Sequence, residues 1–223
     1  MRGRDAAAEV VVATALPLLW SNLLLPRLRL GMRGRTAATT AFATAYGLAF
    51  RARPHWHSPR GLATGLLAAT TITAGYAAAL ALPPLRTKLA EFAARTPEVT
   101  PTEWVTLHIP LGTVYSEELI FRATLDPLLS RTTGRYAKFL APMAFGLWHI
   151  TPARSAGDNP AIAVAATTLG GAILSHLRRR ADNSTTAPAL LHLALNAGGV
   201  LTPRLARRGS MDREACRNVR AGR

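Results

Sequence analysis

Apolar residues gather in seven blocks that are separated by short polar or basic stretches. The blocks cover about residues 8–26, 37–50, 61–83, 104–125, 136–152, 160–177 and 187–203. A helix needs about 20 apolar residues to cross a bilayer, with a range of about 17–25, so most blocks approach the length of a membrane span and 37–50 is short. The pattern predicts an all-α fold, a polytopic transmembrane helical bundle of about seven spans, with six or eight as the alternatives.

Prolines and glycines support these limits. Pro83-Pro84 is expected to close the third block and Asp126-Pro127 the fourth, because proline disrupts the interior of a helix. The Gly170-Gly171 pair would allow a neighbouring helix to approach closely, as small residues do in membranes. Residues 1–203 are therefore predicted to form one integral membrane domain, and residues 204–223 a basic C-terminal tail that is expected to be flexible.

The charge of the chain is strongly basic, with 27 Lys and Arg against 12 Asp and Glu and a net charge of +15. Nearly all of the cations fall between apolar blocks or in the tail, where they would meet anionic headgroups. We therefore expect a multi-pass protein of the cell membrane whose basic loops and tail bind anionic lipids, and no nucleic acid partner. Cys216 is the only cysteine, which excludes an intrachain disulfide and a thiolate metal cage.

Two adjacent carboxylates, Glu117 and Glu118, lie inside the fourth block, with Arg122 four residues after the second. Charges at membrane depth cost about 2.5–3.5 kcal/mol each, so they persist where they are paired or functional. Positions four apart share a helix face, so Glu118 is expected to pair with Arg122 and keep its charge. Glu117, buried beside a like charge, is suited to accept a proton as a general base. The alternative is an ion pair that only fixes helix packing.

Further polar groups lie in two other blocks. His149 comes one turn after Phe145, and it could instead be an interfacial histidine beside Trp148. His192 and Asn196 share a face of the last block, where they could bind a metal, donate hydrogen bonds to an oxyanion, or simply join helices. A carboxylate, two imidazoles and a carboxamide together suit water activation at a peptide bond.

Ideal antiparallel helices would not bring these groups to one depth. With a rise of about 1.5 Å per residue, Glu117, His149 and His192 are expected roughly 12, 20 and 7 Å from a common membrane face. Tilted helices, staggered ends or a water-filled cleft would have to remove that spread. The remaining histidines fit solvated or interfacial positions better than ligand positions; they are His55, His57, His108 and His176.

Three stretches, in this order, resemble the motifs of the CAAX prenyl protease and bacteriocin-processing (CPBP, Abi) family of intramembrane proteases. The family patterns are E-E-x-x-x-R, F-x-x-x-H and H-x-x-x-N. The chain reads Glu117-Glu118-Leu-Ile-Phe-Arg122, Phe145-Gly-Leu-Trp-His149 and His192-Leu-Ala-Leu-Asn196. The resemblance covers about residues 104–203. Ala123 stands where glycine is usual in the family, and DNSTTAP precedes the last motif in place of a Thr-Gly-Ser turn.

The resemblance implies an intramembrane endopeptidase with its active site in a membrane cavity. It implies that Glu117 and His149 activate water and that His192 and Asn196 stabilise the oxyanion. Glu118 is expected to join these catalytic residues as the organiser of Glu117, and Arg122 and Phe145 to support them. The expected partner is a peptide or protein substrate at the membrane, lipidated substrates included. This mechanism requires no cofactor; in the alternative metal mechanism, Glu117, His149 and His192 would hold zinc.

Two other function classes stay open from the residues alone. A proton-coupled membrane transporter would use the same carboxylates and histidines as a relay, although the two halves of the chain show no inverted repeat. A non-catalytic membrane or immunity partner protein would use the seven arginines of residues 204–223 to hold anionic lipid or another protein.

Overall fold

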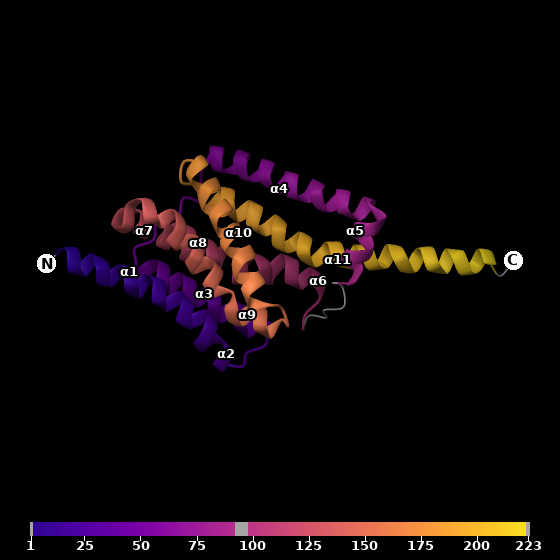
Figure 1. The fold of residues 1–223 in the computed structure, drawn as a ribbon, viewed down its shortest axis with the longest axis horizontal. Coiled ribbons are helices and arrows are strands. Elements are labelled where there is room, and N and C mark those ends of the chain that lie inside the picture. The colour runs from indigo at the N-terminus through magenta and orange to yellow at the C-terminus, as the bar shows by residue number, and fades with distance from the viewer. Residues whose placement is uncertain (1, 92–97, 222–223) are drawn as a thin grey trace.

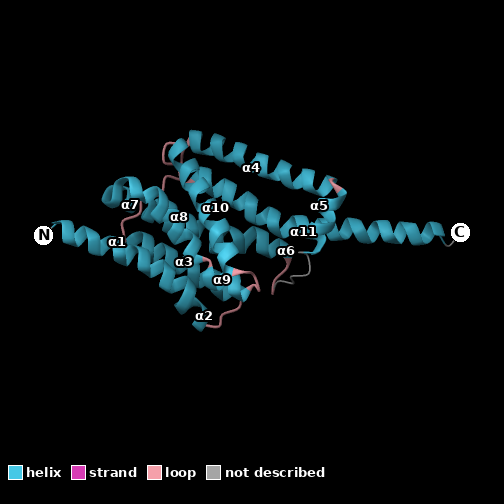
Figure 2. Ribbon diagram, viewed as in Figure 1, coloured by secondary structure: helices cyan, strands magenta, loops and turns pink. Residues whose placement is uncertain are grey.

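The computed structural model describes residues 2–91 and 98–221, and every regular element in these ranges is a helix (Figure 2). The all-α prediction is therefore confirmed. Three segments are π-helical, η1, η3 and η4, and η5 is a 3₁₀ turn. In chain order the elements are α1 Arg2–Leu19, η1 Trp20–Leu24, α2 Leu25–Arg27, α3 Met32–Ala49, α4 Pro59–Ala81, α5 Pro83–Glu91, α6 Pro101–Glu103, η3 Trp104–Tyr115, η4 Glu118–Leu125, α7 Asp126–Thr133, η5 Gly134–Tyr136, α8 Ala137–Trp148, α9 Ile150–Ser155, α10 Pro160–Arg180 and α11 Thr186–Ala221.

Three helical segments of the described chain are long and apolar enough to cross a membrane. They are Ala6–Arg27, Pro59–Ala81 and Pro160–Arg180. Large apolar side chains are exposed on each of them, among them Val11, Leu67 and Ile162. An apolar outer surface of this kind suits contact with lipid tails. Each of the seven predicted blocks contains helix, while the count of seven spans stays a prediction.

Two predicted boundaries fall inside continuous helix. Asp126-Pro127 does not end the fourth block, because η4 passes directly into α7 and Pro127 lies in the first turn of α7. Proline is tolerated here because the hydrogen-bond ladder changes from π-helical to α-helical spacing at this point. The predicted domain boundary at residue 203 lies within α11, which runs on to Ala221 and projects from the bundle in Figure 1. Residues 204–221 therefore continue a helix, and the flexibility of the tail stays a prediction.

The helices pack in pairs around the segment that carries the two carboxylates. α4 lies along α11, α8 packs against α10, and α3 packs against both η3 and η4 (Figure 1). η4 itself packs against α1, α3, α7, α8 and α10, and all eight of its residues are buried. Its charged side chains therefore lie in protein and not in lipid.

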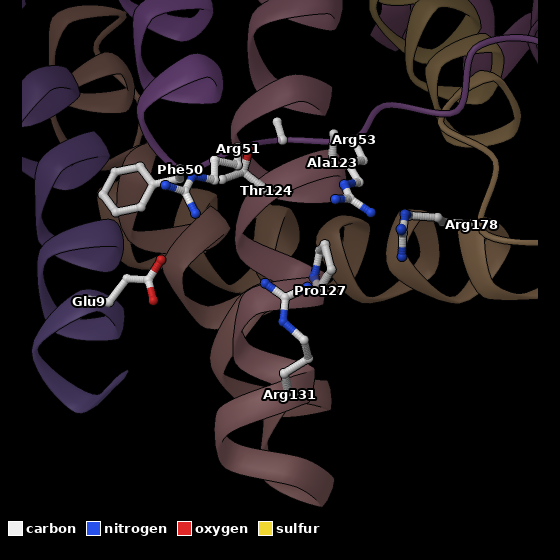
Figure 3. Close-up of a pocket in the computed structure, with 10 residues that line it drawn as sticks. Glu9, Phe50, Arg51, Arg53, Ala123, Thr124, Pro127, Arg131 and Arg178 are labelled. Carbon is white, nitrogen blue, oxygen red and sulfur yellow. The ribbon is translucent and has the colours of Figure 1, made fainter. Parts of the chain in front are cut away.

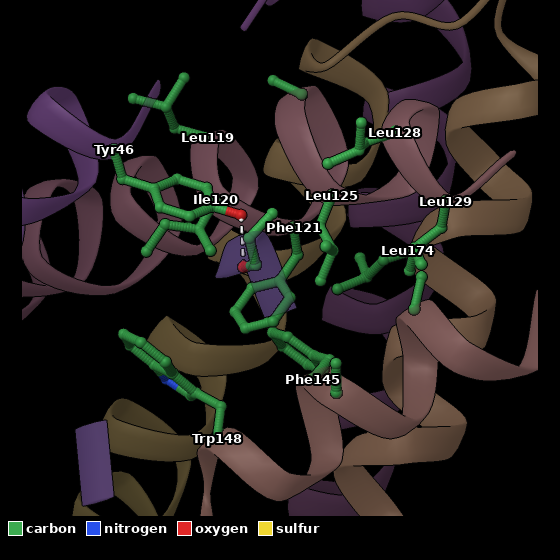
Figure 4. Close-up of a cluster of buried hydrophobic side chains, with 14 of the residues drawn as sticks. Tyr46, Leu119, Ile120, Phe121, Leu125, Leu128, Leu129, Phe145, Trp148 and Leu174 are labelled. Carbon is green, nitrogen blue, oxygen red and sulfur yellow. Dashed lines mark hydrogen bonds between the residues drawn. The ribbon is translucent and has the colours of Figure 1, made fainter. Parts of the chain in front are cut away.

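The apolar core surrounds the same segment (Figure 4). Ile120 and Phe121 are fully buried. The ring of Phe121 meets Phe145 and Trp148 of α8 edge-on, with ring centroids 5.0 and 5.6 Å apart. Aromatic pairs in this arrangement add about 0.5–1.5 kcal/mol each beyond the area that they bury. The core thus fixes α8 against η4 and sets the position of the side chains at the end of α8.

Candidate active site

The helix that carries the carboxylates has π-helical register before Ser116 and again from Glu118 onward. Ser116 donates a hydrogen bond to the carbonyl of Leu111, and Thr124 donates one to the carbonyl of Leu119, each five residues back. Segments of π-helix are rare and occur frequently at functional sites. Glu117 lies between the two π-helical segments, η3 and η4, and Glu118 is the first residue of η4.

Glu118 and Arg122 lie in contact as their spacing indicated. The Nε atom of Arg122 is 3.5 Å from Oε2 of Glu118, and both side chains are fully buried. The guanidinium of Arg122 also lies 4.3 Å from the centre of the Phe145 ring, which is a cation–π geometry. The other carboxylate oxygen of Glu118 is 2.9 Å from Nδ1 of His192. Glu118 therefore joins η4 to α11 as well as pairing with the arginine.

Glu117 faces the histidines of two different helices. Its Oε1 accepts a hydrogen bond from the indole nitrogen of Trp148 at 3.2 Å. Its Oε2 lies 3.6 Å from Nε2 of His192 and 3.9 Å from Nε2 of His149. This second oxygen is buried and has no hydrogen-bond partner in the described structure. One oxygen of Glu117 is thus held in place, and the other is open to a further ligand.

His149 caps the C-terminal end of α8, and its orientation defines the state of its ring. Its Nδ1 lies 2.8 Å from the carbonyl oxygen of Phe145. A carbonyl oxygen only accepts, so Nδ1 carries the hydrogen and Nε2 of the neutral ring is an acceptor. The side chain of His149 is 22% exposed and that of Glu117 is 7% exposed, so His149 lies on the accessible side. Two acceptors about 4 Å apart can hold a water that donates one hydrogen to each.

The expected spread in depth is absent, because Glu117, His149 and His192 meet within hydrogen-bond or one-water distance. The estimate of about 12, 20 and 7 Å treated the fourth, fifth and seventh blocks as ideal spans with common ends. α8 is only 12 residues long, and it ends at Trp148 inside the bundle. His149 therefore lies beside Glu117, at the junction of η3 and η4.

Asn196 lies one turn after His192 on α11 and is half-buried. Its amide nitrogen donates to the backbone carbonyl of His192 at 3.0 Å. No hydrogen bond links it to Glu117 or His149 in the described structure. Asn196 therefore lies one helical turn from His192, with one amide hydrogen used in its bond to the His192 carbonyl and the second without a hydrogen-bond partner among the described residues.

Trp148 belongs to the site although its sequence position suggested a membrane interface. It is 4% exposed, and its indole N–H is directed at Glu117. The sequence feature that could have indicated this role of Trp148 is its position directly before His149 in the Phe145–His149 motif. His108 is buried, with Nδ1 2.8 Å from Thr36 Oγ1 and Nε2 3.1 Å from Glu103 Oε1, so of its two expected positions the solvated one is excluded and the interfacial one stays open.

The described residues contain no group of three or more His, Cys, Asp or Glu side chains arranged to hold a metal ion. The zinc alternative for Glu117, His149 and His192 therefore gains no support from the geometry.

Comparison with known families agrees with the motifs. Residues 100–198 match the family model described as Type II CAAX prenyl endopeptidase Rce1-like, and this range contains all three motifs. The comparison with curated proteins and the comparison with solved structures found no match. Together with the apolar helices, the match identifies a membrane protein related to proteases. The resemblance is confirmed: over residues 100–198, a little under half of its 223 residues, the chain is similar to the Rce1-like type II CAAX prenyl endopeptidase family.

Proposed function

We propose that the protein is an intramembrane endopeptidase in which Glu117 and His149 activate the attacking water. The observation that carries the proposal is the buried Oε2 of Glu117, which has no hydrogen-bond partner and faces Nε2 of His149 at 3.9 Å. Buried polar atoms are almost always hydrogen-bonded, so an orphan acceptor marks a place for a ligand. Water is the smallest ligand that satisfies both acceptors.

The reaction follows from that water. Its two hydrogens point to Glu117 and His149, which leaves an oxygen lone pair directed at the substrate carbonyl carbon. Glu117 takes one proton as the water oxygen bonds to that carbon, and the carbonyl oxygen becomes an oxyanion. The same proton then passes to the leaving nitrogen as the C–N bond breaks. The products are a carboxylic acid and an amine, and Glu117 returns to its ionised form.

His192 and Asn196 are proposed to stabilise the oxyanion. The bond between Nδ1 of His192 and Glu118 fixes the imidazole ring, and Nε2 then faces the site. Because Glu118 accepts the hydrogen of Nδ1, Nε2 carries a hydrogen as well only in the imidazolium form of the ring. In that form Nε2 can donate to an oxyanion, and the free amide hydrogen of Asn196 can add a second bond. Removing one such donor typically costs about 10²–10³ in kcat.

The proposed substrate is a peptide segment near the C-terminus of a prenylated or otherwise lipidated protein. The proposed location is the cell membrane, which this chain would cross several times. The family description names CAAX prenyl endopeptidases. An apolar groove of about 260 Å³ is formed in part by helices that carry the site, and its lining includes Tyr115 of η3, two residues before Glu117, and Leu193 of α11, directly after His192. Such a groove suits a lipid chain, because almost all of its surface is apolar.

Glu117→Gln tests the proposal in detergent-purified protein with a prenylated CAAX peptide and the same peptide without the lipid. The amide cannot accept the proton, so cleavage should fall to background while the protein still folds. Glu91→Gln, on an exposed carboxylate at the end of α5, is the matched control and should cleave as the unchanged protein does. Cleavage that survives Glu117→Gln would show that another group activates water.

A chelator separates direct activation from the metal mechanism. Under the proposal, treatment with a chelator leaves the rate of cleavage unchanged. Loss of activity with recovery on adding zinc would replace direct activation by a metal-bound water.

A further inference from the structure

A polar cavity lies apart from Glu117, His149 and His192, and arginine is the most frequent residue in its lining. It measures about 530 Å³ and is lined by ten residues from five parts of the chain (Figure 3). None of Glu117, His149 and His192 lines it. Its lining consists of Glu9, Phe50, Arg51, Ala52, Arg53, Ala123, Thr124, Pro127, Arg131 and Arg178.

The charges of this arginine pocket are unbalanced. Four guanidinium groups line it against the single carboxylate of Glu9. Figure 3 shows Arg53, Arg131 and Arg178 with their guanidinium groups directed toward the space around Pro127. The planar fork of arginine matches the oxygens of phosphate in a bidentate arrangement. The pocket therefore has the size and charge of a site for a phosphate group.

Arg178 supplies the buried part of the positive charge. It is half-buried, and its Nε has no hydrogen-bond partner in the described structure. One of its terminal nitrogens donates to Oδ1 of Asn183 at 3.1 Å. The buried carboxylate of Asp126 attracts Arg178 from behind and balances part of its charge. An anion in the pocket would give the unused nitrogens of Arg178 an acceptor.

The backbone at Arg51 adds an independent observation. Arg51 has φ of 54° and occupies the position after α3 that usually holds glycine. The turn is closed by hydrogen bonds from Ala52 N to Gly47 O at 2.7 Å and from Arg51 N to Leu48 O at 3.2 Å. A long basic side chain stands at a left-handed position that glycine would fill more easily. The geometry of the turn therefore does not itself require arginine at this position.

The pocket lies at the level where the candidate membrane helices begin or end. Glu9 is near the start of Ala6–Arg27, Arg53 precedes the start of Pro59–Ala81, and Arg178 is near the end of Pro160–Arg180. Basic pockets between membrane helices at this level suit lipid headgroups. We propose that the arginine pocket binds a phosphate-bearing anion, carried either by an anionic phospholipid headgroup or by a soluble phosphate. The proposal does not depend on the protease activity.

The test measures the thermal unfolding midpoint of the purified full-length chain in a zwitterionic detergent. Short-chain phosphatidylglycerol, short-chain phosphatidylcholine and inorganic phosphate are titrated separately. We expect a saturable rise in the midpoint with phosphatidylglycerol and none with phosphatidylcholine. A rise with inorganic phosphate as well would show that the phosphate alone suffices, and a rise with phosphatidylglycerol only would assign the lipid. If neither anion raises the midpoint, the proposal is wrong.

Two variants keep the test independent of folding. Arg131→Gln should weaken the apparent affinity about fivefold, which is the effect of one arginine at a lipid surface. Arg135→Gln lies four residues away, is exposed and does not line the pocket, so it should bind unchanged. Arg51→Gly suits the left-handed backbone, so it should fold at least as well and still bind more weakly. Equal affinities for Arg131→Gln and Arg135→Gln would overturn the proposal.

Discussion

The indole nitrogen of Trp148 donates a hydrogen bond of 3.2 Å to Oε1 of Glu117, and the two residues are 31 positions apart in sequence. The bond fixes one carboxylate oxygen and leaves the other facing His149 and His192. The indole ring cannot turn freely, because it packs edge-on against Phe121 and is 4% exposed. Trp148 is therefore a positioning residue for the proposed general base.

Trp148→Phe should lower kcat for the prenylated peptide about tenfold and leave KM nearly unchanged, because it removes the N–H and keeps an aromatic ring in the core. Steady-state kinetics measure both constants. Trp20→Phe is the matched control, since the indole nitrogen of Trp20 is buried without a hydrogen-bond partner. An equal loss of kcat in both variants would mean that the effect is general packing.

Glu118→Gln should destabilise the protein by about 3 kcal/mol or more, because it leaves the buried guanidinium of Arg122 without its carboxylate. Reversible unfolding in mixed detergent micelles gives the free energy of unfolding. Adding Arg122→Met in the same chain removes the unpaired charge and should recover part of that loss. A double variant that is less stable than Glu118→Gln alone would contradict the ion-pair account.

The Gly170-Gly171 pair offers two adjacent substitutions with opposite outcomes. A Cβ on Gly171 would lie 2.9 Å from Cδ1 of Phe145, whereas one on Gly170 would meet nothing within 4 Å. Gly171→Ala should therefore cost about 1–3 kcal/mol and lower the rate of cleavage, because Phe145 holds His149 and covers Arg122. Gly170→Ala should be neutral or stabilising, as alanine favours helix. Thermal unfolding and peptide cleavage of the two variants, compared side by side, check this prediction.

The pH dependence of stability should include a contribution from Glu103, at the start of the fourth block. Its hydrogen bond with Arg33, followed by that with His108, lowers the pKa of this carboxyl from 4.5 to about 2. A lowered pKa in the folded state stabilises the protein above pH 4.5, and this contribution is lost as the pH falls toward 2. Thermal unfolding between pH 6 and 3 should show a steeper loss in the unchanged protein than in Glu103→Gln. Equal slopes would mean that the contact does not contribute in solution.

The helical fold could be predicted because apolar blocks of span length leave few alternatives. The helix ends could not be predicted equally well. Pro127 reads as a helix end in the sequence but lies within a continuous helix, since π-helical hydrogen bonding accommodates it. Pro203 likewise lies inside α11 and does not end it, so the predicted boundary at residue 203 falls within a helix, while the division into a membrane domain and a tail stays a prediction.

The candidate site was predictable as a set of residues and not as a geometry. The spacing of Glu118 and Arg122 on one helix fixed their contact, because positions four apart share a face. The approach of His149 to Glu117 depends on where α8 ends, which no local pattern shows. The hydrogen bond from Trp148 to Glu117 could not be predicted for the same reason. Tryptophan at a helix end suits a headgroup region as well as a buried hydrogen bond.

Phe145 serves two different groups with two different parts of the same residue. Its carbonyl oxygen anchors the ring of His149, while its own ring covers the guanidinium of Arg122. A smaller side chain at position 145 would expose the guanidinium of Arg122 to a more polar environment. The backbone carbonyl that binds His149 would stay in place. The shielding of the Arg122 charge and the orientation of the His149 ring can therefore be altered separately, although Phe145 provides both.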